Sequence, residues 1–109
     1  MSKFTDYIDG LQDKAGVLAK EELKKLIGTA MNDKSEFVRL QAENIERWTE
    51  QLATGEITPA GYKKLVSKMD LLTKLEKIKL EVAAKASAQR LAEGIRKHIL
   101  DGLCKLLLG

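Results

Sequence analysis

The chain has 109 residues, 44% of them hydrophobic and 32% charged, with a formal net charge of +3. This composition excludes a disordered chain, and the length predicts a single domain, residues 1–109, with one modest core. Because no apolar run approaches the ~18 residues of a membrane span, the sequence also predicts a soluble protein.

The cysteine content and the first residues bear on localisation. Cys104 is the only cysteine, so no internal disulfide can form. The first residues are charged and contain no apolar core of a secretory signal. We therefore expect a reducing compartment, most simply the cytoplasm.

Positive charge is concentrated in the second half of the chain. Residues 1–55 carry eight Lys/Arg against ten Asp/Glu, and residues 56–109 carry eleven against six. We favour the interpretation that the two halves pack together, and keep as the alternative a basic surface that meets phosphate or an anionic membrane. Nucleic acid is disfavoured as a partner because the cations are mostly lysine, whereas base recognition relies on arginine, asparagine and glutamine.

The composition favours helices, because it is rich in Leu, Lys, Ala and Glu and has one proline and few aromatic residues. The first predicted helix covers residues 3–31, where apolar residues recur at steps of three to five. Gly10 and Gly16 each weaken a helix interior by roughly 1 kcal/mol, so the sequence allows a break near residues 13–16.

The second predicted helix covers residues 35–54. Ser35 is suited to cap its start, and Gly55 stands where a glycine commonly follows a helix end. Thr58 and Pro59 then supply a capping hydroxyl and a proline at the first helical position. These two residues predict the start of a third helix.

The link of residues 55–57 is short, which favours an antiparallel hairpin between the second and third helices. The stretch LATGEITPAGYKKLVSK resembles SHOCT, a short helical-hairpin motif found at the ends of many small bacterial proteins; it covers about a sixth of the chain. The chain departs from that motif at Gly61, where the family has an acidic residue, and we assign no family. The matching residues are Leu52, Gly55, Ile57, Thr58, Tyr62 and Leu65.

The third predicted helix covers residues 59–107, with a break near Gly94 as the alternative. Two sets of its residues are spaced by eleven, which keeps a helix face straight. A competing seam with heptad spacing lies on another face, so this helix needs two neighbours, or a neighbour and a partner chain. The eleven-residue sets are Met69, Leu80, Leu91 and Gly102, and Thr73, Ala84, Ile95 and Leu106; the heptad seam is Leu71, Leu75, Ile78 and Val82.

These patterns predict an all-α fold: a helical hairpin or small bundle of three to four helices, with a long C-terminal helix and coiled-coil-like packing. Because the predicted helices differ in length, we expect an elongated molecule whose leucine-rich end pairs with another chain. The residues expected to form this interface are Leu80, Ala84, Leu91, Ile95, Ile99, Leu103 and Leu106.

The sequence contains no evident catalytic or ligand-binding constellation. Cys104 lies six residues after His98, about 240° around a helix, which is unsuited to a dyad. No HxxxH or ExxH motif and no phosphate-binding glycine loop is present. We therefore predict that the protein is not an enzyme and that it has no cofactor, no metal ion and no small-molecule substrate.

The leading functional hypothesis is a helical interaction or assembly protein that acts through a homo-oligomeric or partner-helix interface, of the accessory kind found in bacteria and phages. The alternative is a peripheral protein that lies on a membrane surface. It would use the basic amphipathic segment 94–109, where Arg96, Lys97 and Lys105 flank an apolar face.

Overall fold

The computed structural model describes residues 3–13, 16 and 18–108. Within these residues the chain is helical and has no strand, which confirms the predicted all-α fold. A short 3-10 helix, η1 (Lys77–Lys79), follows the fourth α-helix, and a π-helix, η2 (Ile95–Leu103), joins the fifth to the sixth. The α-helices are α1 (Lys3–Gly10), α2 (Lys20–Met31), α3 (Glu36–Thr54), α4 (Pro59–Glu76), α5 (Val82–Gly94) and α6 (Cys104–Leu108).

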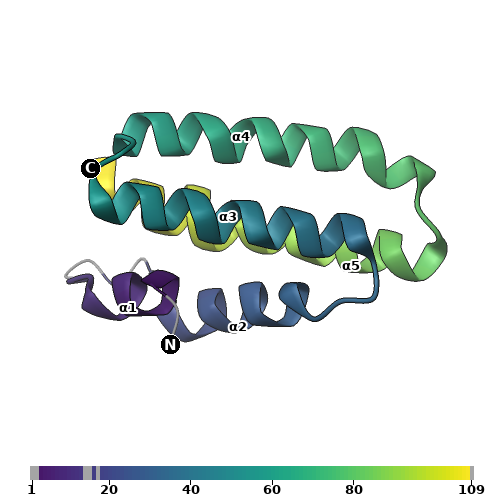
Figure 1. Cartoon of the computed structure of the whole chain (residues 1–109), viewed down its shortest axis with the longest axis horizontal. Coiled ribbons are helices and arrows are strands. Elements are labelled where there is room, and N and C mark those ends of the chain that lie inside the picture. The colour runs from purple at the N-terminus through teal and green to yellow at the C-terminus, as the bar shows by residue number, and fades with distance from the viewer. Residues whose placement is uncertain (1–2, 14–15, 17, 109) are drawn as a thin grey trace.

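In the described part of the chain, four helical segments lie side by side, each antiparallel to the one before it (Figure 1). They are α2, α3, α4 and the continuous run α5–η2–α6. Helix α1 contacts α2 and α3 near the end of the molecule that carries the C-terminus. The radius of gyration is 13.3 Å and the extents are 39 × 26 × 25 Å. A compact domain of this length has a radius of about 13 Å, so the prediction of an elongated molecule is wrong.

The caps predicted for α3 and α4 are present. Ser35 Oγ accepts a hydrogen bond from the Val38 N–H at 3.4 Å. Thr58 Oγ1 accepts one from the Gly61 N–H at 3.0 Å. Gly55 ends α3 in a left-handed conformation, φ 81°, which a residue with a Cβ adopts only with strain. The antiparallel hairpin between α3 and α4 therefore forms where these local signals predict it.

The first predicted helix, residues 3–31, is in fact two helices. Helix α1 ends at Gly10, and the link to α2 contains Gly16 in a left-handed conformation, φ 68°. The break lets Phe4 and Ile8 be buried against α3, which a straight continuation of α2 would not allow. The break occurs beside the two glycines that weaken a helix here.

The third predicted helix, residues 59–107, is also interrupted, but not at Gly94. Helix α4 ends at Glu76, and α5 begins at Val82 after η1 and two extended residues. Folding back buries an apolar stripe that a single long helix would leave without a partner in the chain. The predicted break near Gly94 is wrong, because this residue has helical angles, φ −65° and ψ −40°, and the helix continues through η2.

Gly94 allows α5 to approach α2 closely. A Cβ built at this position would lie 2.5 Å from Cδ2 and 2.7 Å from Cδ1 of Leu26. Real carbon atoms do not approach so closely, so any side chain here forces Leu26 to move. The glycine therefore serves the close packing of α5 against α2, at the point where α5 passes into η2.

We expect Gly94→Leu to lower the free energy of unfolding by about 1–3 kcal/mol, because the new side chain overpacks the contact with Leu26. Adding Leu26→Ala should recover at least half of this loss. Gly28→Leu is the matched control: Gly28 lies in α2 with open space around its Cβ position, so the change should be neutral or stabilise by up to ~1 kcal/mol. Urea unfolding measures all of these variants, and equal losses for the two glycine substitutions would contradict the packing role.

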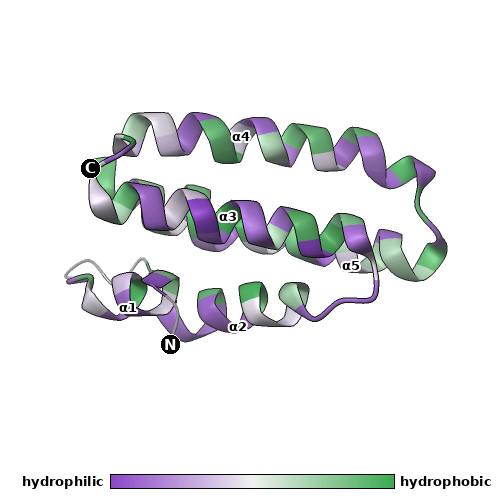
Figure 2. Ribbon diagram, in the orientation of Figure 1, coloured by the Kyte–Doolittle hydropathy of each residue, from purple (hydrophilic) through white to green (hydrophobic). Residues whose placement is uncertain are grey.

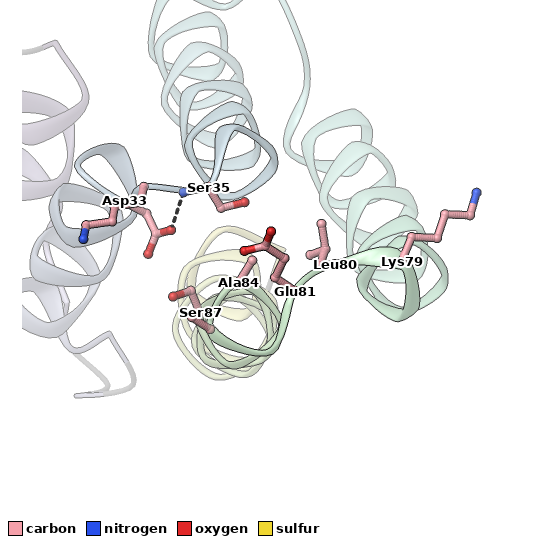
Figure 3. A pocket seen from close by; sticks show the side chains of 9 residues that line it. Asp33, Ser35, Lys79, Leu80, Glu81, Ala84 and Ser87 are labelled. Atoms are coloured by element: carbon pink, nitrogen blue, oxygen red, sulfur yellow. Dashed lines mark hydrogen bonds between the residues drawn. The ribbon is translucent and has the colours of Figure 1, made fainter.

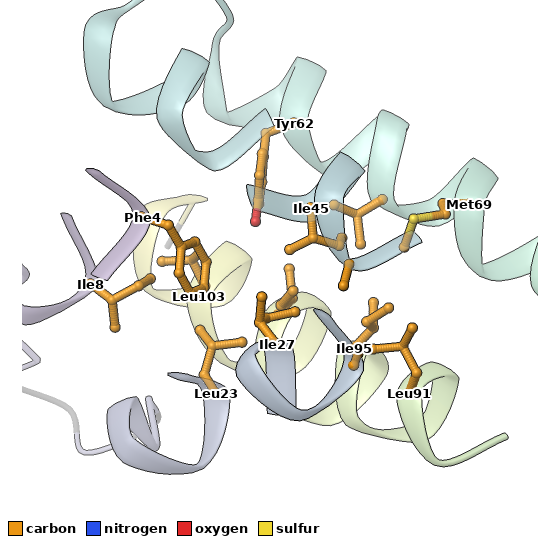
Figure 4. Packing of buried hydrophobic residues seen from close by; sticks show 14 of the residues in the cluster. Phe4, Ile8, Leu23, Ile27, Ile45, Tyr62, Met69, Leu91, Ile95 and Leu103 are labelled. Atoms are coloured by element: carbon orange, nitrogen blue, oxygen red, sulfur yellow. The ribbon is translucent and has the colours of Figure 1, made fainter. Parts of the chain in front are cut away.

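Apolar side chains from α1 to η2 meet in one core (Figure 4). Each helix carries both hydrophilic and hydrophobic residues (Figure 2). The buried ones recur every three or four positions, as do Val38, Ala42 and Ile45 on α3, which an amphipathic helix requires. The core residues labelled in the close-up are Phe4, Ile8, Leu23, Ile27, Ile45, Tyr62, Met69, Leu91, Ile95 and Leu103.

One polar pair lies inside this core and joins α3 to α4. Thr49 and Tyr62 are fully buried, and their hydroxyl oxygens are 2.9 Å apart. Thr49 Oγ1 also donates to the Ile45 carbonyl oxygen at 2.7 Å. A threonine hydroxyl has one hydrogen to donate, so Tyr62 is the donor in the pair. Burial raises the pKa of Tyr62 well above its usual value.

Candidate functional site

The residues predicted to form an interface lie mostly inside the single chain. Four of them are at most 2% exposed and three are half-buried. The apolar stripe that they form packs against the chain's own helices. The buried four are Leu91, Ile95, Ile99 and Leu103; the half-buried three are Leu80, Ala84 and Leu106.

The heptad seam, in contrast, lies on the outside of the molecule. Leu71 and Leu75 on α4 are 59% and 60% exposed. Ile78 in η1 is 71% exposed, and Val82 at the start of α5 is 85% exposed. We call these four residues the outer stripe. It follows the second half of α4 and crosses the turn into α5 (Figure 1).

The outer stripe is a cluster rather than a scatter of single residues. Five of the seven exposed large hydrophobic side chains in the described residues fall between positions 71 and 82, Leu72 being the fifth. Single exposed apolar residues are normal on a protein surface and need no explanation. The exposed ones here follow one another closely along the chain, and we take the outer stripe as the candidate functional surface.

Charged residues of both signs border the outer stripe. Lys79 Nζ lies 3.6 Å from Glu76 Oε2, and Lys77 Nζ donates to Gln89 Oε1 at 2.5 Å. An apolar centre with a polar, solvated rim is the usual anatomy of a protein interface.

A buried carboxylate behind the stripe ties α4 to η2. Asp70 is 7% exposed, and its Oδ2 accepts a hydrogen bond from Arg96 Nη2 at 3.2 Å. Lys74 Nζ lies 3.6 Å from the same oxygen. These cations compensate a charge that would be costly to bury alone, and they set the position of η2 along α4.

Two open grooves border α5. The first, of about 470 Å³, lies between the start of α3 and the turn before α5, with Leu80, Ala84 and Glu81 among its lining residues (Figure 3). The second, of about 290 Å³, lies between α2 and α5 and includes Ser87 and His98. Eleven positions along a helix, about 16 Å of rise, separate that serine from that histidine, so they cannot act together as nucleophile and base.

Cys104 is also unsuited to act as a nucleophile. It is 2% exposed, and burial raises the pKa of its thiol to about 11, although Lys63 partly opposes the shift. The thiol is therefore protonated at neutral pH and behaves as a small apolar group. His98 borders the groove beside α2, whereas Cys104 borders another beside Lys63 and Leu100.

The described residues contain neither a metal-binding cluster nor a membrane-spanning helix. No group of three or more histidine, cysteine or acidic side chains is placed there to hold a metal ion. No helix among them combines the length and the apolar character needed to cross a membrane.

Comparison with known proteins gives no relative from which a function could be carried over. No family model, no curated protein and no solved structure matches the chain.

Proposed function

We propose that the protein is a non-enzymatic helical assembly protein whose outer stripe binds a second copy of the chain. The observation that carries this proposal is the exposure of Leu71, Leu75, Ile78 and Val82 at heptad spacing. Leu71 and Leu75 lie on one face of α4, four residues apart, and Ile78 and Val82 follow in η1 and at the start of α5. Covering these residues removes apolar surface from water, which favours association by roughly 25 cal/mol per Å².

The order of apolar residues along the outer stripe favours a second copy as the occupant. Two-fold symmetry pairs a surface with itself in the reversed direction. In the reversed order that sets Leu71 against Val82 of the other copy, Leu75 stands against Ile78 and Glu76 against Lys77. Lys74 stands against Lys79 in this order, so the apolar pairs and not the charges favour self-association.

The membrane-surface alternative draws no support from the C-terminal segment, because its apolar residues Ile95, Ile99 and Leu103 face the core. Lysines border the outer stripe, however, so vesicle binding is measured beside self-association.

We also propose a cytoplasmic location, since a single buried thiol with no cysteine partner is typical of proteins from reducing compartments.

The test is to replace the centre of the outer stripe. We expect Leu75→Asp with Ile78→Asp to weaken dimerisation by about 100-fold or more, because each aspartate would be buried without a partner in the interface. The free energy of unfolding of the single chain should change by less than about 1 kcal/mol, because both positions are exposed. Light scattering on a sizing column measures the mass, and urea unfolding measures the stability.

Leu40→Asp is the matched control. Leu40 lies on α3 and is 50% exposed, outside the outer stripe, so this variant should keep the wild-type mass. A wild-type chain that stays monomeric, or a stripe variant that keeps the wild-type mass, would contradict the proposal. If the wild-type monomer instead floats with anionic vesicles and the stripe variant does not, the stripe binds lipid and not a second copy.

A further inference from the structure

The turn between α4 and α5 consists of residues that normally form helix. We call residues 77–81 the hinge. From Lys74 to Ala86 the chain has no glycine, proline, asparagine, aspartate or serine. The residues there are lysine, leucine, glutamate, alanine, isoleucine and valine, most of which are strong helix formers. The other tight turns of the bundle differ, because Ser35 caps one and Gly55 and Thr58 bound the other.

Within the hinge the Leu80 N–H donates to the Lys77 carbonyl oxygen at 3.1 Å, but no side chain of the described residues caps α5. The backbone bends through Leu80 at φ −86°, ψ 158° and Glu81 at φ −65°, ψ 158°. Glu81 occupies the capping position of α5, yet its side chain, within the described residues, accepts none of the helix N–H groups. The bend is therefore maintained by the packing of α5 against the rest of the bundle and not by its own sequence.

The residues before and after the bend pair in a register that two antiparallel helices of different chains could also adopt. Arg96 lies 3.2 Å from Asp70, and Lys77 lies 2.5 Å from Gln89. Both pairs are symmetric about position 83. If the hinge straightened, two long antiparallel helices could make the same pairs between chains, with residue 83 of each copy near the two-fold axis. The residues that would meet there include Ala83 and Ala84, whose small side chains permit close approach.

We propose that two copies of the chain exchange residues 82–108 by straightening the hinge into one helix, so that α5, η2 and α6 of each copy complete the bundle of the other. The exchanged dimer keeps the core contacts of the monomer and adds helical hydrogen bonds across the hinge. It also aligns the eleven-residue stripe through Leu80 on one straight face. Both proposals involve a second copy of the chain. The exchange depends on the hinge and the core, whereas the proposed function depends on the outer stripe.

The test uses a proline that fits the bent hinge and not the straight one. Val82 is the first residue of α5, where proline is favoured, and Glu81 before it is already extended as a proline requires. In a continuous helix the same proline is internal and disfavoured. The proteins are unfolded, refolded at high concentration and separated by size. We expect the wild type to form dimer, and Val82→Pro to dimerise at least about a thousandfold more weakly than Val82→Ala, which removes the same side chain from the outer stripe.

Glu81→Ser provides an independent variant in case the proline variant fails to fold. Serine at this position caps α5 and favours the bent hinge, so the dimer should weaken by about fivefold for each of its two hinges. Equal dimer fractions in the wild type and in these hinge variants would overturn the inference.

A distance measurement identifies the exchanged form directly. Spin labels at Lys68→Cys and Arg90→Cys, in a Cys104→Ala background diluted with unlabelled chain, report the distance within one chain. These positions are 22 residues apart, which is about 33 Å along a continuous helix. In the bent chain they lie on neighbouring helices about 10 Å apart and are offset by eight positions from the register of Asp70 and Arg96, which gives a distance of about 16 Å. The dimer should give the long distance. A dimer with the short distance would overturn the exchange and leave the outer stripe as the interface, and a dimer that survives Leu75→Asp with Ile78→Asp would overturn the proposed function alone.

Discussion

Replacing Leu103 by aspartate is expected to unfold the protein. Leu103 lies in η2, is fully buried and packs in the central core. A carboxylate at this site has no partner, and burying it costs more than about 4 kcal/mol, which is comparable to the whole stability of a small domain. Circular dichroism should show loss of the cooperative thermal transition at neutral pH.

Leu108→Asp is the control for this prediction. Leu108 is five residues further along the same C-terminal run and is 48% exposed, so the change should cost less than about 0.5 kcal/mol. A Leu103→Asp variant that melts close to the wild-type temperature would show that the C-terminal run does not pack in the bundle. The fold described above would then be wrong in its central feature.

Substitutions in the buried pair of Thr49 and Tyr62 are expected to give the second large change in the free energy of unfolding. We expect Tyr62→Ala to cost about 3–5 kcal/mol through the cavity that it leaves, and Tyr62→Phe only about 1 kcal/mol. Thr49→Val should cost about 1–3 kcal/mol, more than Tyr62→Phe, because it leaves the Tyr62 hydroxyl buried without an acceptor. In Tyr62→Phe, Thr49 still donates to the Ile45 carbonyl. Urea unfolding at neutral pH measures the loss of stability in the three variants. A larger loss in Tyr62→Phe than in Thr49→Val would contradict the assignment of Tyr62 as the donor.

The same pair predicts a pH dependence. Because the pKa of Tyr62 is raised on folding, its contribution to stability is fully present below about pH 10 and is lost as the pH rises further. Cys104, with its pKa raised to about 11, acts in the same direction. The free energy of unfolding should therefore fall less steeply above pH 10 in Tyr62→Phe than in the wild type.

Local signals in the sequence are sufficient for the elements whose ends are capped. Ser35, Gly55, Thr58 and Pro59 act on the backbone within a few residues, so the bounds of α3 and the start of α4 follow from their side chains alone. The all-α class follows in the same way from the summed preferences of the residues.

The turn at the hinge could not be predicted from the sequence, because its residues favour helix and only the packing of α5 bends the chain there. Gly94 shows the opposite case: a residue that weakens a helix is retained inside one because Leu26 occupies the space of a side chain. Both outcomes depend on contacts between segments far apart in the sequence.

The site was predictable only in part. Periodicity identifies the apolar face that contains Leu91 and Ile99, but it does not say whether the partner is the chain itself or another molecule. Because the chain folds back, that face is used internally, and the heptad seam is the one left outside. The spacing of Leu71, Leu75 and Ile78 was the available signal for the outer stripe.

The most direct test of the central claim is the mass of the wild-type chain in solution, measured by light scattering beside Leu75→Asp with Ile78→Asp. We predict twice the chain mass of 12.1 kDa for the wild type and 12.1 kDa for the variant, with both proteins folded. Wild-type protein that stays at 12.1 kDa across the accessible concentrations, or a variant that keeps the doubled mass, would contradict it.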